Sequence, residues 1–171
     1  MVLHVFNPEH DLALASGLSN FTAPHAGRRL RADLGYLPAL WAGEDDCVLV
    51  EHVDQARRAY GRLRARVGGA PCHFVDKSQL SRLAIDRVEP WGWDMALRST
   101  LIRYGVRPEA CPSESEIAAV RECSHRRYAA KVTAMYCRAM GRPSRASIFR
   151  IAGSMRKLRR RKSKPKASRL R

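Results

Sequence analysis

Short apolar runs separated by amphipathic stretches form the main pattern of the first half of the chain. Val2 to Phe6, Cys47 to Val50 and His73 to Val75 are brief, contain branched or aromatic side chains and are bounded by turn residues, which is typical of buried strands. Tyr36 to Trp41 is also apolar, and we expect a further strand there, confined to a sheet edge or a strand start because it contains Pro38.

Helical periodicity fills the intervals between these runs. The apolar residues of Val53 to Val67 fall on one helical face and the arginines on the other, and Gly68 follows as a stop. Ala26 to Leu34 also has helical periodicity, and we expect Thr22 to cap this helix from the preceding turn. Strands that alternate with helices at this spacing predict an α/β fold, a Rossmann-like parallel sheet flanked by helices.

Cap signals predict further helices in the second half of the chain. Asp94 can cap a helix of about ten residues, and Ser113 with Glu116 three positions later has the spacing of a capping box. Ser124 is expected to cap a longer helix that ends near Met140.

These patterns divide the chain into three segments. We expect residues 1–122 to form the Rossmann-like domain, residues 123–143 a linking helix and turn, and residues 144–171 a basic tail. The last sixteen residues are cationic and almost free of apolar groups, so the tail is predicted to be disordered.

Charge is distributed as unevenly as hydrophobicity. The net charge of the chain is +16, yet residues 1–122 contain 15 Lys+Arg and all 16 Asp+Glu. Residues 123–171 contain the other 17 basic residues and no acid. This asymmetry keeps open a nucleic-acid-binding protein, whose basic tail would contact phosphates without reading their sequence.

The spacing of the cysteines and the length of the apolar runs indicate the cellular compartment of the protein. Five cysteines without Cys-x-x-Cys spacing are typical of free or buried thiols in a reducing environment. No apolar run approaches the roughly 20 residues of a membrane-spanning helix, and no cationic N-terminal segment precedes an apolar one. We therefore expect a cytoplasmic protein without a membrane partner.

A dense group of polar residues follows the first predicted strand. In an open α/β sheet the loop that leaves this strand lies at the carboxyl edge, where ligands bind. The helix start that follows could bind an anionic group. The candidate substrate-binding residues are Asn7, Glu9, His10, Asp11, His25 and Arg28. The alternative is structural: Asp11 would cap a short helix and His10 would be solvated.

Motifs for complete catalytic machinery do not occur in the sequence. It contains no Gly-rich phosphate loop, no Gly-x-Ser-x-Gly elbow and no His-Glu-x-x-His pair. His10 and His25 could share a metal with Glu9 or Asp11, but their spacing does not demand one, and we assign no metal ligands. Trp91 and the neighbouring Trp93 have two interpretations, as anchors of the following helix or as the lining of a pocket.

Four blocks of the sequence resemble a known family. They are NPEHDLALAS, LSNFTAPHAGRRLRADLGYLPALWA, PWGWD and SHRR. Together they are similar to the N-terminal half of uncharacterised bacterial proteins, chiefly from Bacteroidales, that resemble ATP-grasp enzymes. The resemblance covers roughly residues 1–143 and implies a pre-ATP-grasp domain, a Rossmann-like unit that contributes substrate contacts.

The resemblance also implies an enzyme class for a full-length parent. ATP-grasp enzymes typically join a carboxylate to an amine through an acyl-phosphate, with ATP and magnesium held by lobes that would follow residue 143. The sequence contains no acidic residue after Glu122, so we expect a truncated substrate-binding domain that is inactive alone and has no cofactor of its own. A standalone small-molecule-binding domain with a basic tail remains an alternative.

Overall fold

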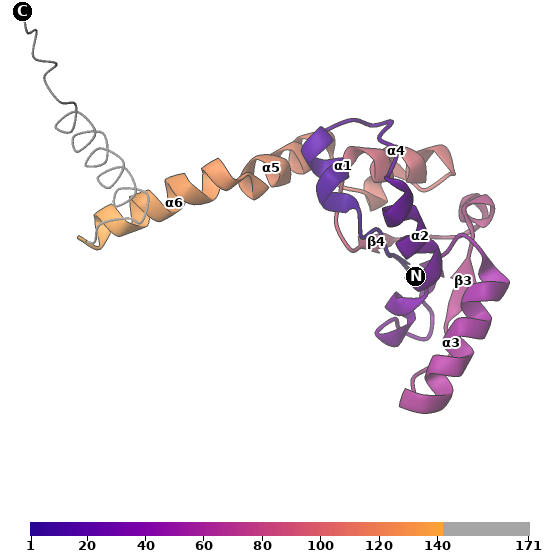
Figure 1. The fold of residues 1–171 in the computed structure, drawn as a ribbon. Coiled ribbons are helices and arrows are strands. Elements are labelled where there is room, and N and C mark those ends of the chain that lie inside the picture. The colour runs from indigo at the N-terminus through magenta and orange to yellow at the C-terminus, as the bar shows by residue number, and fades with distance from the viewer. Residues whose placement is uncertain (142–171) are drawn as a thin grey trace, which may run out of the picture. The chain divides into compact units, whose positions relative to one another are not determined.

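The computed structural model describes residues 1–141, and its centre is a four-stranded, all-parallel sheet (Figure 1). β1 (Val2–Val5) lies between β2 (Cys47–Leu49) and the edge strand β4 (Arg87–Pro90), and β3 (His73–Val75) forms the other edge. The strand order β3-β2-β1-β4 reverses beside β1, because the chain winds outwards to β3 and then crosses to the far side. The α/β class predicted from the sequence is confirmed.

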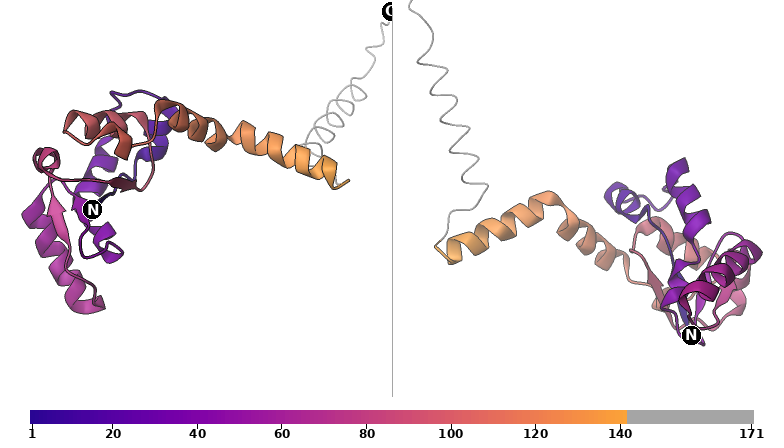
Figure 2. Two further views of the ribbon diagram at one scale, coloured as in Figure 1. Left: turned by 180° about the vertical axis from the view of Figure 1, so that it is seen from behind. Right: turned by 60° about the horizontal axis from the view of Figure 1, so that its bottom comes forward.

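Helices connect and flank the strands. Their bounds are α1 His10–Ser16, α2 His25–Leu34, η1 Leu37–Leu40, α3 Val53–Val67, η2 Lys77–Arg82, α4 Met95–Arg103, η3 Pro108–Ala110, α5 Glu114–Ser124 and α6 Arg126–Ala139, where η marks a 3₁₀ helix. α3 runs beside β3, and α1 contacts α4 (Figures 1 and 2). The helix predicted at Val53–Val67 is observed with the same bounds.

One face of the sheet forms an apolar core that extends across all four strands. Leu3 of β1 and Leu101 of α4 have no exposed surface, so their burial contributes about 2 kcal/mol each relative to exposed leucines. The buried members of this cluster are Leu3, Val5, Cys47, Val75, Leu80, Ile85, Val88, Leu101 and Val106. This core fixes α4 against the sheet, with its N-terminus at the carboxyl ends of the strands.

On the opposite face of the sheet, the side chains change from apolar at β3 to ionisable at β4. Phe74, Val48, His4 and Glu89 are paired in register and therefore form one row on the same face. Phe74 and Val48 belong to an apolar cluster with α3 and η1, which within residues 1–141 contains no residue of β1 or β4. The row is thus apolar over β3 and β2 and ionisable over β1 and β4.

The described residues divide into two units, residues 1–121 and residues 122–141. The second unit contains α6, and among residues 1–141 no helix has the length and apolar character needed to cross a membrane. The predicted disordered tail, residues 144–171, lies outside the described residues, as do Arg142 and Pro143 of the predicted turn.

Two cap predictions in the second half are confirmed. Asp94 precedes α4, and its Oδ1 accepts a hydrogen bond from Leu97 N at 2.8 Å. In the capping box, Ser113 Oγ accepts from Glu116 N at 3.2 Å and Glu116 Oε2 accepts from Ser113 N at 2.8 Å. These contacts satisfy amide groups that the first helical turn leaves without partners.

Three local predictions are wrong. Tyr36 to Trp41 contains η1 and not a strand, and Ala39 at its centre is buried against the apolar face of β2 and β3. Thr22 does not cap α2, whose N-cap is Pro24 without a side-chain hydrogen bond. The N-cap of α6 is the residue after Ser124, His125, whose ring nitrogen accepts from the Arg127 amide at 3.1 Å.

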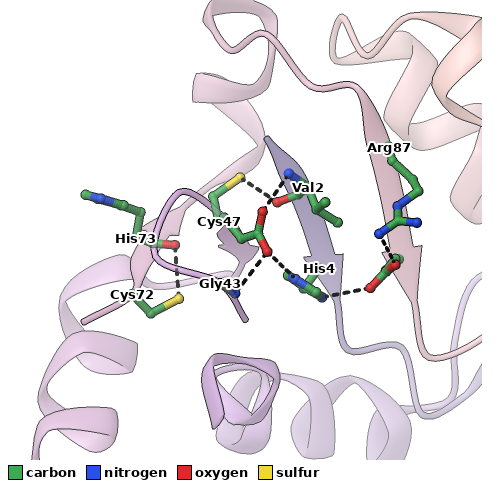
Figure 3. A network of polar contacts seen from close by, with 9 residues as sticks. Val2, His4, Gly43, Cys47, Cys72, His73 and Arg87 are labelled. Atoms are coloured by element: carbon green, nitrogen blue, oxygen red, sulfur yellow. Dashed lines mark hydrogen bonds and ion pairs between the residues drawn. The ribbon is translucent and has the colours of Figure 1, made fainter. Parts of the chain in front are cut away.

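Asp46 fastens the loop before β2 to the start of β1. Figure 3 shows Val2, His4 and Gly43, the three residues that its carboxylate contacts. Its Oδ1 accepts from Val2 N at 2.9 Å, and its Oδ2 accepts from Gly43 N at 3.0 Å and lies 3.3 Å from His4 Nε2. The hydrogen bond from Val2 lowers the pKa of the Asp46 carboxyl below its usual value; partial burial opposes this, and Gly43 and His4 reinforce it. The ionised carboxylate is therefore the form that stabilises the fold.

We predict that Asp46→Asn lowers the free energy of unfolding by about 1–3 kcal/mol at pH 7, because the side-chain NH2 of asparagine would place a donor against one of the two backbone N–H donors, Val2 or Gly43. Because the pKa of Asp46 is lower in the folded protein than in the unfolded chain, its carboxylate contributes its full stabilisation above the ordinary aspartate pKa of about 4. That contribution is lost as the pH falls through the pKa of the folded state. The gap between wild type and variant, measured by urea unfolding, should therefore close below about pH 4.

Asp45→Asn is the matched control for this measurement, because Asp45 is the exposed neighbour on the same turn. It should change stability by less than about 0.5 kcal/mol. A wild-type-like Asp46→Asn protein, or a gap independent of pH, would show that Asp46 does not fasten the two segments.

Candidate functional site

One pocket at the carboxyl edge of the sheet is lined by the last residues of β1 and β2 and by residues that follow β3 and β4. The pocket has a volume of about 230 Å³. Val5, Leu49 and Lys77 mark where β1, β2 and β3 end, and Asp94 stands four residues after β4. The edge beside β1 is the point where the strand order reverses, which is where open α/β sheets bind their ligands.

The wall of the pocket combines an apolar base with charged and hydroxyl groups. Its apolar part comes from the strand ends, the residues before α2 and the first turns of α4. The polar lining residues are Asn7, Glu9, Thr22, Arg28, Arg31, Glu51, Lys77, Asp94 and Thr100. A small number of converging polar groups in an apolar hollow is the usual composition of a small-molecule site.

Asn7 connects the end of β1 to the loop that enters α4. The side chain is buried; its Nδ2 donates to Gly92 O at 2.7 Å, and its Oδ1 accepts from Gly92 N at 3.3 Å. The same Nδ2 lies 3.4 Å from Asp94 Oδ2. One amide side chain thus positions two walls of the pocket relative to each other.

Glu9, Arg31 and Glu51 form an ion-pair bridge across the pocket. Arg31 of α2 donates from Nη1 to Glu9 Oε1 and from Nε to Glu51 Oε1, the latter at 3.1 Å. Glu9 follows β1 and Glu51 follows β2, so one guanidinium holds α2 above both strand ends. The second oxygen of Glu9, Oε2, is buried and accepts no hydrogen bond from the described residues.

Asp94 has a double role at the pocket wall. Burial raises the pKa of its carboxyl above the usual aspartate value, while hydrogen bonds from the Leu97 and Ala96 amides and from the Asn7 side chain oppose that shift. The carboxylate caps α4 and faces the pocket at the same time. Its oxygens are already engaged by the helix and by Asn7, so it positions the site more than it contributes free charge.

The structure brings together three of the six candidate residues. Asn7, Glu9 and Arg28 line the pocket. His10, Asp11 and His25 are not among its lining residues: Asp11 and His25 are exposed, and His10 Nε2 lies 3.2 Å from Asp11 Oδ1.

The His10 ring packs against Gly92. A side-chain Cβ at position 92 would stand 2.0 Å from a ring carbon of His10, so this contact requires glycine. His10 Nδ1 is buried and has no hydrogen-bond partner among the described residues. The ring therefore packs against the same loop that Asn7 holds, outside the pocket lining.

Sequence reasoning did not assign Arg31, Glu51 or Lys77 to the site. Glu51 and Lys77 could have been found by applying the strand-end rule to every strand instead of the first alone. Glu51 follows β2 by two residues and Lys77 follows β3 by two, whereas Arg31 stands one helical turn after Arg28 on α2.

A second, more open groove lies over β1 and β4. It has a volume of about 520 Å³, and all three tryptophans of the chain line it, together with His4 and Glu89. Trp93 packs against the core, as the anchor interpretation requires, while Trp91 is exposed and meets Phe6 edge-to-face at 5.5 Å. His4 lies 3.6 Å from Glu89 at the floor of this groove.

Comparisons add no relative to these observations. No family model, curated protein or solved structure matches the chain. Within residues 1–141, no three histidine, cysteine or acidic side chains are grouped as metal ligands. The description of the site therefore depends on its own geometry.

We predict that Asn7→Ala lowers the free energy of unfolding by about 1–3 kcal/mol, since it leaves the Gly92 peptide groups and Asp94 without their partner in a buried setting. Chemical denaturation measures the loss. Asn20→Ala, at an exposed position between α1 and α2, is the control and should stay within about 0.5 kcal/mol of wild type. Equal stability of the two variants would mean that Asn7 does not join the two walls.

Proposed function

We propose that this chain is the substrate-binding domain of an ATP-grasp-like carboxylate–amine ligase and that the strand-end pocket binds the acceptor substrate. The observation that carries the proposal is the convergence of all four strand ends on one polar pocket. The two sequence blocks with the most specific resemblance supply Asn7, Glu9, Thr22 and Arg28 to that pocket.

The proposal divides the reaction between this domain and the ATP-binding lobes of the ligase. Residues 1–121 would bind and orient the acceptor, with Arg31 and Asn7 fixing the walls around it. ATP and magnesium would be bound by the lobes of a full-length parent, because no phosphate-binding loop occurs here. The chain is therefore proposed to be inactive alone.

A cytoplasmic location is part of the same proposal. All five cysteines lie among the described residues, and each is a free thiol. Burial raises the pKa of Cys47 and of Cys72 to about 11, so both remain protonated at neutral pH. Protonated, unpaired thiols are what a reducing compartment maintains.

A nucleic-acid-binding protein is the rival proposal, favoured by the 17 basic residues after Glu122. Phosphate contacts by a polycation depend steeply on salt and do not read bases. If nucleic acid is the natural ligand, the described domain must add a preference for particular base sequences. A chain that shows no preference between sequences supports the ligase proposal.

We predict that Mg-ATP gives no saturable heat in isothermal titration at about 0.15 M salt, because the elements that hold phosphates are absent. The basic segment can attract any polyanion, so magnesium tripolyphosphate is the matched control. Both titrants should give the same weak, unsaturated signal. A micromolar dissociation constant for ATP alone would place a nucleotide site in this chain.

The decisive experiment uses the DNA downstream of this reading frame. We expect it to encode an ATP-binding lobe, and co-expression of that product with this chain should yield ADP release that neither polypeptide shows by itself. Glu51→Gln, which weakens the hold on Arg31, is expected to reduce this activity. If the downstream DNA encodes no such lobe, a standalone small-molecule-binding domain becomes the better description.

A further inference from the structure

Three carboxylates and three cations line the strand-end pocket, so its formal charges balance, but they are unevenly paired. Glu9 and Glu51 are both engaged by the Arg31 guanidinium. Asp94 accepts from the Leu97 amide at 2.8 Å and lies 3.4 Å from Asn7 Nδ2. Each carboxylate of the pocket therefore has a partner that belongs to the protein.

Two cations of the pocket have no such partner. Arg28 projects from α2 and Lys77 from the segment after β3, and both line the pocket. Within residues 1–141, neither forms an ion pair with a carboxylate. Arg28 and Lys77 are therefore the cations of the pocket that remain available to an anionic group of a ligand.

The N-terminal end of α2 adds to this field. α2 has ten residues, and its N-cap, Pro24, supplies no side-chain acceptor to the first amides. Thr22 and Ala23, which lead into the helix, line the pocket. The segment that leads into the positive end of the helix dipole thus lines the same pocket as the two cations, and that end of a helix favours an anion.

The buried carboxylate of Glu9 indicates that the ligand also carries a hydrogen-bond donor. Its side chain is 7 % exposed, yet Oε2 receives no hydrogen bond from the described residues. A buried carboxylate oxygen without a donor is costly, and a hydroxyl or ammonium hydrogen of a ligand would satisfy it.

We propose that the pocket binds a small acid, a molecule whose carboxylate or phosphate lies between Arg28 and Lys77 and whose hydroxyl or ammonium group donates to Glu9. The volume of about 230 Å³ restricts this ligand to a small metabolite, since drug-sized ligands occupy roughly 300–1,000 Å³. This inference rests on the proposed function and names the substrate class of the same site. Arg31 is a positioning residue, because its guanidinium is committed to the two glutamates.

The test is titration of the full chain with four small molecules, followed by amide chemical shifts in two-dimensional NMR. Glycerate and glycerol 3-phosphate carry the two acid groups, glycerol carries the hydroxyls alone, and putrescine is a cation. We expect the two acids to shift the pocket amides of Phe6, Ala23 and Ala96 saturably. The affinity of one acid over the other identifies carboxylate or phosphate as the natural group.

Three variants separate the pocket from the general basicity of the chain. Arg28→Gln and Lys77→Gln should each raise the dissociation constant of the preferred acid about tenfold or more, as expected for loss of a charge-assisted contact. Arg29→Gln removes the same charge one residue away, outside the pocket lining, and should stay within about twofold of wild type. Unchanged amide shifts in α3 verify that each variant is folded.

The outcomes distinguish this inference from the function on which it rests. Equal weakening by all three variants would mean diffuse charge attraction and would overturn the inference. Saturable binding of glycerol or putrescine at the pocket amides would overturn the acid class and leave a small-molecule pocket in place. If none of the four molecules shifts the pocket amides at about 20 mM, the inference fails together with the binding role of the pocket.

Discussion

The hydrogen bonds between the Asn7 side chain and the loop before α4 are the constraint on which the site depends. β1 is anchored in the core by Leu3 and Val5, but its carboxyl end must still be placed relative to α4, which begins 90 residues later at Met95. Asn7 makes that connection through both peptide groups of Gly92. An ionised aspartate could not replace it, since a carboxylate accepts hydrogen bonds but cannot donate one to Gly92 O. The pocket walls then follow from one buried side chain and one ion-pair bridge.

Much of the fold could be predicted because its central elements have strong local patterns. The runs at β2 and β3 are continuous and apolar, and α3 is amphipathic over its whole length. β4 was missed because an edge strand with one buried side chain, Val88, has no such run. Tyr36 to Trp41 was taken for a strand because apolar composition does not distinguish a buried 3₁₀ turn from a short strand.

The site was only partly predictable, for a different physical reason. Sequence order placed Asn7 and Glu9 correctly near the end of the first strand, since a strand end is a local property. Arg31 and Lys77 reach the pocket because of strand order and helix orientation, which are properties of the whole sheet. His10 has the chemistry of a site residue, but its ring packs against Gly92, where the lack of a side chain leaves room for it.

The edge strand β4 also bears on how this chain behaves at high concentration. An exposed strand edge offers unpaired backbone groups to other chains, and short, charged strands with proline limit such pairing. β4 has four residues, two of which, Arg87 and Glu89, are exposed and form an ion pair at 2.7 Å; its last residue, Pro90, has no N–H. The edge therefore resists the addition of a further strand, and intermolecular β-aggregation should not begin there. This holds although the apolar cluster on the second face of the sheet does not reach β4.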